Sequence, residues 1–370
     1  NNHWVGLYSN TMEDAKIMID KYSATDPYYT GMAQVLMAIN LGVATDLWGD
    51  VPYSKAFQGD KNVFVAPADP QQSVIASIQS LLDGAIANFA KAKSANVDVP
   101  NGDDLYYGGN VTQWTKAAWT LKARYANRLS LRDPQSATNV LADLANGITS
   151  AADNMENPHP AAGNSQNQWG AYQNQRAGNM VANKFFVDML NANSDPRLPY
   201  YLSKDKNGAY TGADVTQETI NVDASTIGTY FDVAQNYPLV TSYEASFLAA
   251  EAKARLGQDA SADLNAGIKA SVARATGGNS DGSLIATYTL LTATQNAVLT
   301  EKWKAMYGQI EAYNDYRRTG IPAVTVRPES AGATQTAIPK RLPYPEVETN
   351  TNPNIKLIDI MTPVWWATSN

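Results

Sequence analysis

Neutral amide side chains alternate with two large aromatic side chains between residues 154 and 174. The residues concerned are Asn164, Gln166, Asn167, Gln168, Trp169, Tyr172 and Gln173. Sugars are neutral polyols with apolar C–H faces, so they need an aromatic ring for stacking and amides for hydrogen bonding. The stretch therefore predicts a carbohydrate-binding surface. The alternative is a polar loop anchored by one buried tryptophan, and the residue types alone leave both readings open.

Tyrosines in other loops are weaker candidates for the same role. They are Tyr106 and Tyr107 in the segment LYYGG, Tyr200, Tyr201 and Tyr210. The chain has 20 Tyr and 8 Trp against only 7 Phe. That bias suits stacking on polar ligands, although tyrosine also serves helix packing, so the bias by itself decides little.

Residues that catalysis would need are scarce. Only His3 and His159 occur, which leaves histidine-ligated metal sites and proton relays without ligands. The segment around Ser280 reads G-x-S-x-G, but a nucleophile elbow needs a strand before it and a histidine later in the chain. This segment follows a helical pattern, and no histidine comes after it. We therefore predict a protein without enzymatic activity.

Acidic residues do not form a convincing site either. Glu311 and Asp315 are one helical turn apart, but Arg317 and Arg318 lie beside them, so we expect an ion-paired helix end. The segment 205–208 reads Asp-Lys-Asn-Gly, like the start of a calcium loop, yet the later ligand positions hold Ala and Thr. We predict no cofactor, while one isolated surface Ca²⁺ stays possible.

The composition limits the possible partners. A formal net charge of −7 argues against nucleic acid and anionic membranes, because both favour a basic surface. Cysteine is absent, which excludes disulfides and thiolate chemistry. No apolar run approaches the roughly 18 residues of a membrane-spanning helix. The first residues show no signal peptide, so we expect a cytosolic chain or a trimmed one.

Helical periodicity recurs along most of the chain and predicts an all-α fold. The predicted helices cover about 4–21, 27–48, 70–91, 111–131, 135–149, 178–191, 241–256, 260–275 and 291–300. Small residues in the pair at 241–275 suggest tetratricopeptide-like packing. Periodicity fades over 150–236, where Asn, Gly, Pro and Tyr become common, and we expect ligand loops there. The segment 323–370 should be irregular.

The stretch 301–322 predicts one long amphipathic helix. Its apolar stripe consists of Trp303, Met306, Ile310 and Tyr313. The charged residues should lie on the opposite, solvated face. Gly320 and Pro322 should end the helix.

Five segments together resemble the RagB/SusD family of surface nutrient-binding lipoproteins. They are the LWGDVP run at 47–52, Asp-Pro-Arg-Leu at 195–198, the tyrosine-glutamate helix with Tyr243, Glu244, Ala250, Glu251 and Ala252, the stretch 301–322, and RLPYPEVETNTNPN at 341–354. They occur in the order that the family has. The likeness covers nearly the whole chain.

This resemblance implies one SusD-like domain over 1–370, with about four tetratricopeptide-like helix pairs packed against an irregular, loop-rich half. Helical-repeat parts would cover 27–149 and 237–322, a ligand-side subregion 150–236, and a tail 323–370. It also implies a lipid-anchored protein of the outer-membrane surface that delivers glycans, or in some branches peptides, to a TonB-dependent transporter. Family members carry their lipidated cysteine in a segment before this one, so we expect an N-terminally trimmed chain. The alternative function is a helical-repeat protein that binds peptide or protein.

Overall fold

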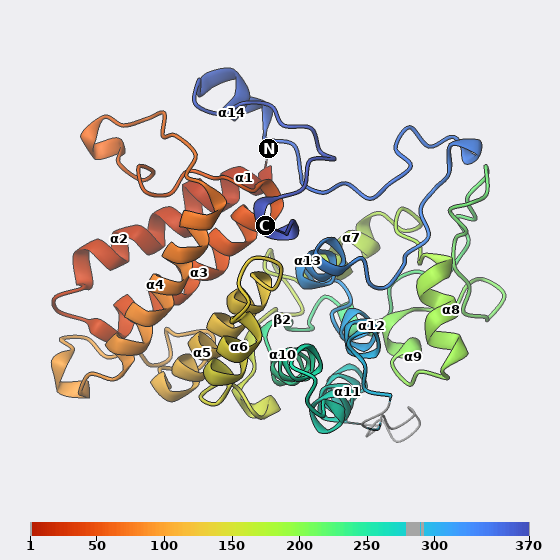
Figure 1. The fold of residues 1–370 in the computed structure, drawn as a ribbon, viewed down its shortest axis with the longest axis horizontal. Helices are drawn as coiled ribbons and strands as arrows, with labels where there is room; N and C mark the ends of the chain where they lie inside the picture. The colour runs from red at the N-terminus through yellow and green to blue at the C-terminus, as the bar shows by residue number, and fades with distance from the viewer. Residues whose placement is uncertain (1, 279–288, 290–291, 370) are drawn as a thin grey trace. The chain divides into compact units, whose positions relative to one another are not determined.

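The computed structural model of the chain describes residues 2–278, 289 and 292–369 and is largely α-helical (Figure 1). It consists of two compact units. The first contains residues 1–148, 317–319 and 339–370, and the second contains residues 149–316 and 320–338. The only sheet in the described part of the chain has two strands. The predicted all-α fold is therefore confirmed.

The first unit is built from helices, most of which pack on their neighbours in sequence. They are α1 (Asn2–Val5), a π-helix (Gly6–Met12), α2 (Glu13–Tyr22), α3 (Pro27–Trp48), α4 (Gln71–Phe89), α5 (Val111–Arg128), α6 (Ser136–Leu144) and α14 (Glu346–Thr351). α2 packs on α3, α3 on α4, α4 on α5, and α5 on α6. This is the helix-pair arrangement that the periodicity predicts.

Local signals set the ends of the long helices in this unit. Pro27 occupies the first turn of α3, where its missing N–H leaves no helical hydrogen bond unmade. Gly49 ends α3 with a φ of +85°. Asn110 caps α5, because its side chain accepts hydrogen bonds from the main-chain N–H groups of Thr112 and Gln113.

Two of the five family-like segments contact each other in the first unit. The N–H of Leu342 donates to the carbonyl of Leu47 at 2.8 Å, and the indole N–H of Trp48 donates to the carbonyl of Pro343 at 2.9 Å. The guanidinium of Arg341 donates to the carbonyl of Trp48 at 3.1 Å. These segments therefore have a structural role, because they join the end of α3 to the irregular C-terminal part of the chain.

The second unit combines a short β-ribbon with a helical group. Its elements are β1 (Met155–Asn157), α7 (Gln168–Gln175), α8 (Lys184–Ala192), α9 (Leu198–Tyr201), β2 (Tyr237–Val240), α10 (Ser242–Arg255), α11 (Ser261–Ala275), α12 (Gln295–Ala305) and α13 (Ile310–Thr319), whose last three residues belong to the first unit. The strands pair antiparallel. α10, α11 and α12 pack on one another. Gly267 lets α11 approach α10, because a Cβ there would lie 3.1 Å from the ring of Phe247.

The prediction of one continuous helix over 301–322 is wrong, because two helices form there. α12 ends at Ala305 and α13 begins at Ile310. Gly308 lies between them with a φ of +77°, a left-handed conformation that a right-handed helix cannot contain. A Cβ at this position would also stand 2.2 Å from Cζ of Phe231. The predicted helix end at Gly320 is confirmed by its φ of +73°.

The prediction that the charged residues of this stretch face solvent is also wrong. Each charged residue of the stretch is at most 5% exposed. These residues are Glu301, Lys302, Lys304, Glu311, Asp315, Arg317 and Arg318. Lys302 Nζ lies 2.8 Å from Asp315 Oδ2 and 3.8 Å from Glu251 Oε2. Lys304 Nζ lies 2.5 Å from Glu301 Oε1. Burial of Glu301, Lys302, Lys304 and Asp315 is tolerated because each has an opposite charge close by.

Arg197, from the family-like segment 195–198, extends this group of charges. Its side chain is fully buried and donates to Asp195 Oδ2 at 2.6 Å, to Glu301 Oε2 at 3.3 Å and to Ser271 Oγ at 2.9 Å. We call Asp195, Arg197, Glu251, Glu301, Lys302, Lys304 and Asp315 the buried charge cluster. It joins the start of α9 to α10, α11, α12 and α13 inside the second unit.

Candidate carbohydrate-binding site

A buried asparagine caps helix α7 and holds it in place. Asn167 is 1% exposed, and its Oδ1 accepts from the N–H of Trp169 at 3.1 Å. Its Nδ2 donates to the carbonyl of Gln235 at 2.9 Å, and its main-chain N–H donates to the carbonyl of Val233 at 2.9 Å. Because both side-chain groups of Asn167 are used inside the protein, we give it a positioning role.

Trp169 and Tyr172 lie one turn apart on α7, and we call them the α7 aromatic pair. Their exposed fractions are 37% and 47%. Phe231 stacks on Trp169, with 5.4 Å between ring centroids and 27° between planes. Gly170 permits this close packing, since a Cβ there would stand 2.4 Å from the carbonyl oxygen of Phe231. Trp169 is therefore supported by Phe231 while part of its ring stays accessible.

Three amide side chains of the same segment complete the candidate site. Asn164 and Gln168 are exposed, and Gln168 Nε2 donates to the carbonyl of Gln166 at 3.1 Å. Gln173 follows Trp169 by one helical turn, and its Oε1 is buried with no hydrogen-bond partner among the residues that the structure describes. A buried acceptor of this kind is satisfied by a water molecule or by a ligand hydroxyl.

The loop before α7 and the β-ribbon are fastened by side chains. His159 Nδ1 lies 2.7 Å from the carbonyl oxygen of Ser165, which closes the loop on itself. Arg274 on α11 donates to Glu156 Oε1 at 2.7 Å and to the carbonyl of Asn236 at 2.8 Å. These bonds connect β1, the start of β2 and α11. The segment that precedes the α7 aromatic pair is therefore fixed to the helical group of the second unit.

Tyr106 and Tyr107 belong to the first unit and pack on a tryptophan. Both contact Trp114 edge to face, with centroid distances of 5.6 and 5.5 Å, and both are half-buried. The indole N–H of Trp114 donates to Asp104 Oδ2 at 2.7 Å. By packing on Trp114, Tyr106 and Tyr107 help to hold the loop 101–110 in place.

Tyr210 and Tyr201 lie in the second unit. Tyr210 is half-buried, packs against the aromatic cluster that includes Tyr201 and Phe231, and has Lys204 Nζ 5.8 Å from its ring centroid. Tyr201 is fully buried, and burial raises the pKa of its hydroxyl well above the ordinary value. Of these two tyrosines, Tyr210 keeps some exposure, whereas Tyr201 belongs to the core.

The calcium-like segment forms a hydrogen-bonded turn. The carboxylate of Asp205 accepts from the N–H groups of Asn207 and Ala209 and from the hydroxyl of Thr211. The N–H of Ala209, followed by the hydroxyl of Thr211, lowers the pKa of this carboxyl. Within the described ranges, no group of three or more His, Cys, Asp or Glu side chains is arranged to hold a metal ion.

Of the two catalytic patterns in the sequence, one lies outside the described residues. This is the G-x-S-x-G segment, whose Ser280 falls in 279–288. The other, Glu311 with Asp315, is buried, and Asp315 pairs with Lys302. Phe231 and Gly170 are the supporting residues that sequence analysis missed. The only local signal for them was a glycine directly after Trp169.

The match to a protein family decides the identity of this fold. A family described as "Starch-binding associating with outer membrane" matches residues 1–345. The chain belongs to the SusD-like family. Resemblance to RagB/SusD proteins, predicted from five short segments, is thereby confirmed. At family level, SusD-like proteins are binding proteins and not enzymes.

Solved SusD-like structures share this fold over nearly the whole chain. A SusD-like protein from Bacteroides thetaiotaomicron has 22% identity and a TM-score of 0.80, with 99% of this chain and 86% of that chain covered. A chitin-binding SusD homologue from Flavobacterium johnsoniae has 21% identity and a TM-score of 0.84, with 99% and 86% covered. A SusD/RagB family protein from B. thetaiotaomicron has 24% identity and a TM-score of 0.76, with 100% and 88% covered. Among curated proteins, no sequence matches the chain.

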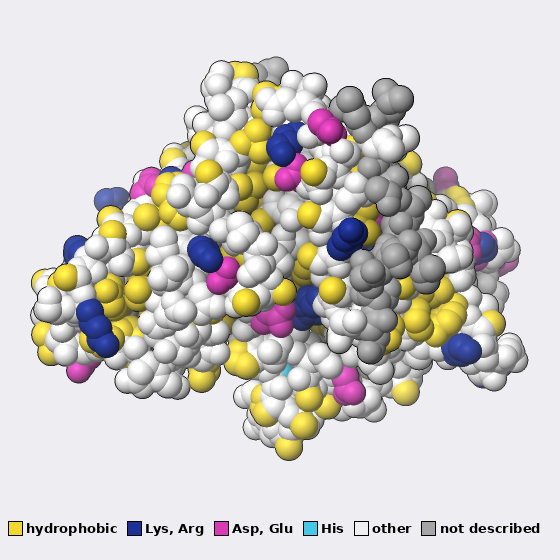
Figure 2. Space-filling view, turned by 90° about the horizontal axis from the view of Figure 1, so that it is seen from below, with side chains coloured by type: hydrophobic (Ala, Val, Ile, Leu, Met, Phe, Trp, Pro, Cys, Tyr) yellow, Lys and Arg dark blue, Asp and Glu magenta, His cyan; other side chains and the backbone are white. Residues whose placement is uncertain are grey.

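The family description indicates association with the outer membrane. Among the described residues, no helix combines the length and the apolar character that crossing a membrane requires. On the face shown in Figure 2, lysine and arginine side chains are scattered among other residues and do not gather into one basic patch.

Proposed function

We propose that this SusD-like protein is a non-catalytic glycan-binding protein of the cell surface that passes its ligand to a TonB-dependent, SusC-like transporter. The observation that carries the proposal is the α7 aromatic pair, with Trp169 supported by Phe231 and still 37% exposed. A ring supported on one side loses little side-chain entropy when a sugar stacks on its exposed part. The family description and the chitin-binding relatives support a glycan as the ligand class.

The ligand would be held by stacking and by amide hydrogen bonds. Trp169 and Tyr172 would contact the apolar face of a sugar ring, while Asn164, Gln168 and Gln173 would bond to its hydroxyls. None of these five side chains carries a charge, which favours a neutral oligosaccharide. No covalent step is involved, so the bound glycan leaves unchanged.

Replacing Trp169 by alanine is expected to weaken binding of a cognate neutral oligosaccharide by at least about tenfold, equivalent to about 1.4 kcal/mol. Isothermal titration against cellotetraose, maltotetraose and an N-acetylglucosamine tetramer measures the effect. Trp169→Phe keeps a ring over Phe231 and should lose less affinity. Thermal unfolding should change little, because the side chain is partly exposed.

Tyr22→Ala is the matched control, since this tyrosine is 44% exposed and lies on α2 of the first unit. An affinity unchanged by Trp169→Ala, or loss of the folded state in that variant, would remove the α7 aromatic pair from the proposal. Binding of peptides with no binding of any glycan would replace the proposed function by the peptide-binding alternative.

The transporter partner has its own test. If the proposal holds, the complete lipid-anchored protein should co-purify with a TonB-dependent transporter from detergent-solubilised outer membranes. Recovery of the protein from the outer membrane without any such transporter, under conditions that preserve known membrane complexes, would argue against delivery to a transporter.

A further inference from the structure

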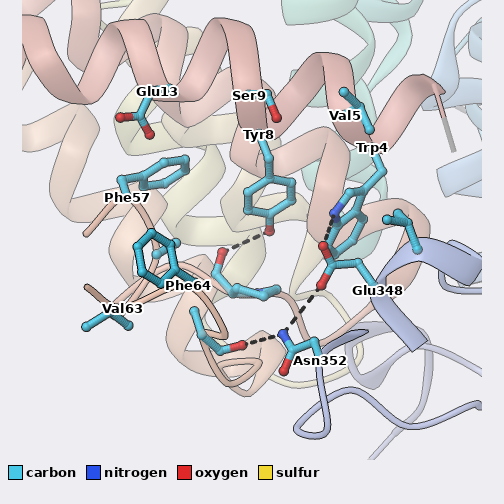
Figure 3. A pocket seen from close by; sticks show the side chains of 14 residues that line it. Trp4, Val5, Tyr8, Ser9, Glu13, Phe57, Val63, Phe64, Glu348 and Asn352 are labelled. Carbon is cyan, nitrogen blue, oxygen red and sulfur yellow. Dashed lines mark hydrogen bonds between the residues drawn. The ribbon is translucent and has the colours of Figure 1, made fainter. Parts of the chain in front are cut away.

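A pocket with aromatic walls lies in the first unit, far along the sequence from α7. Its volume is about 520 Å³, within the range of small-ligand sites. Residues of the π-helix Gly6–Met12, the loop 52–66 and helix α14 line it (Figure 3). The residues that matter for its chemistry are Tyr8, Ser9, Glu13, Phe57, Phe64 and Glu348.

Stacked rings form one wall of this pocket. Trp4 stacks on Tyr8 with 4.6 Å between centroids, and Tyr8 stacks on Phe57 with 5.9 Å and 19° between planes. The hydroxyl of Tyr8 donates to the carbonyl of Pro52 at 2.8 Å, so its polar group is already used. Phe64 also lines the pocket and is 77% exposed. An exposed phenylalanine beside a stacked aromatic wall offers a ring for an apolar ligand face.

Two uncommon backbone conformations bring these side chains to the pocket. Residues Gly6–Met12 form a π-helix, a rare form that is frequent at functional sites and that carries Tyr8 and Ser9 here. Phe57 has a φ of +57°, a left-handed conformation that costs free energy for a bulky residue. Both features place side chains on the same pocket. Backbone strain of this kind is typical of ligand sites.

The polar groups of the pocket divide into used and available ones. Glu348 accepts from the indole N–H of Trp4 at 3.2 Å and from Asn352 Nδ2 at 3.4 Å, so both of its oxygens are engaged. Ser9 and Glu13 have no side-chain hydrogen bond or ion pair to any residue that the structure describes. Glu13 and Phe57 both line the pocket, and both are labelled in Figure 3. One hydroxyl and one carboxylate are therefore available to a ligand.

The electrostatics of the pocket favour an uncharged ligand over an anion. Glu13 and Glu348 are among its lining residues, and none of those residues is lysine or arginine. Burial, followed by the negative charge of Glu348, raises the pKa of the Tyr8 hydroxyl well above its ordinary value. The negative charges of Glu13 and Glu348 would likewise repel a sulfated or carboxylated ligand. A carboxylate readily accepts hydrogen bonds from neighbouring hydroxyls of a neutral sugar.

We propose that this pocket is a second carbohydrate site that holds one uncharged pyranose ring, with Phe57 and Phe64 against its C–H face and Glu13 and Ser9 bonded to its hydroxyls. The proposal rests on the proposed function, because it assumes that the ligand is a glycan. A purely apolar occupant would leave the carboxylate of Glu13 facing it without a partner, which costs free energy.

The test uses the complete chain and the same three neutral tetrasaccharides, with tri-galacturonate as the anionic probe. Wild-type protein should bind a cognate tetrasaccharide at two sites, and Trp169→Ala and Phe64→Ala should each leave one. In the Trp169→Ala background, Phe64→Ala should weaken the remaining binding by at least about tenfold. Leu357→Ala is the matched control, because Leu357 is also 77% exposed and belongs to the first unit.

Glu13→Gln separates a ligand contact from a merely structural role. The amide keeps the shape of the side chain but removes its charge. The ratio of the affinity for the neutral tetrasaccharide to the affinity for tri-galacturonate should therefore fall at least about fivefold, while the fold is unchanged. A stoichiometry of one that Phe64→Ala does not alter would overturn the second site and leave the proposed function standing. Failure of wild-type protein to bind any neutral tetrasaccharide would overturn the proposed function itself.

Discussion

Replacing Arg197 by methionine is expected to lower the free energy of unfolding by about 3–5 kcal/mol, the usual cost of breaking a buried ion pair on one side. The guanidinium is fully buried and donates to Asp195, Glu301 and Ser271. Methionine would fill much of the same space but would leave two carboxylates buried without this cation. Urea unfolding of the complete chain, followed by circular dichroism, measures the change.

An exposed ion pair provides the control for this prediction. Lys184 pairs with Asp188 on α8, and their side chains are 48% and 58% exposed. Lys184→Met should therefore change the free energy of unfolding by no more than about 0.5 kcal/mol. Equal effects of the two substitutions would contradict the view that burial makes the Arg197 contacts important for stability.

Replacing Gly308 by alanine is expected to destabilise the protein by about 2–5 kcal/mol, from two separate causes. An L-residue at a φ of +77° costs about 1–2 kcal/mol, and forcing a methyl group into an occupied space costs about 1–3 kcal/mol. The occupied space is the ring of Phe231, whose Cζ would lie 2.2 Å from the new Cβ. Since Phe231 supports Trp169, the same substitution should also weaken glycan binding.

Gly208→Ala isolates the conformational part of that effect. Gly208 has a φ of +81° in the same unit, but nothing lies within 4 Å of a Cβ built there. Gly208→Ala should lower the free energy of unfolding by about 1–2 kcal/mol and leave glycan affinity unchanged. If Gly308→Ala were no more harmful than Gly208→Ala in either measurement, the contact between Gly308 and Phe231 would not support the site as we infer.

Periodicity predicted most helices because it depends on local sequence. The helix predicted over 27–48 forms at Pro27–Trp48, and the pair predicted at 241–256 and 260–275 forms at Ser242–Arg255 and Ser261–Ala275. Capping residues and glycines that end helices act over a few residues, so a linear reading detects them. The stretch 301–322 is one exception, because the left-handed Gly308 interrupts the predicted helix. Helices α7 and α14 are others, because they form in segments where no helix was predicted.

The candidate site could be predicted only in part. Trp169 and Tyr172 share one face of α7, as their spacing of three residues requires, and both reach solvent. Their amide neighbour Asn167 turned inward, because the first N–H groups of α7 needed an acceptor. Residue type predicted hydrogen bonding at this position, but the direction of that bonding depends on the carbonyls of a segment almost seventy residues away.

By itself, the sequence determined the all-α class, most helix boundaries and the membership of the SusD-like family, because short segments and local periodicity carry that information. Tertiary structure decided which charges are buried, since seven charged residues between 301 and 318 look solvated in a linear pattern and are not. It also decided which aromatic rings meet. Tyr8, Phe57 and Phe64 form one pocket because residues far apart in sequence are brought together by packing, which no local pattern reports.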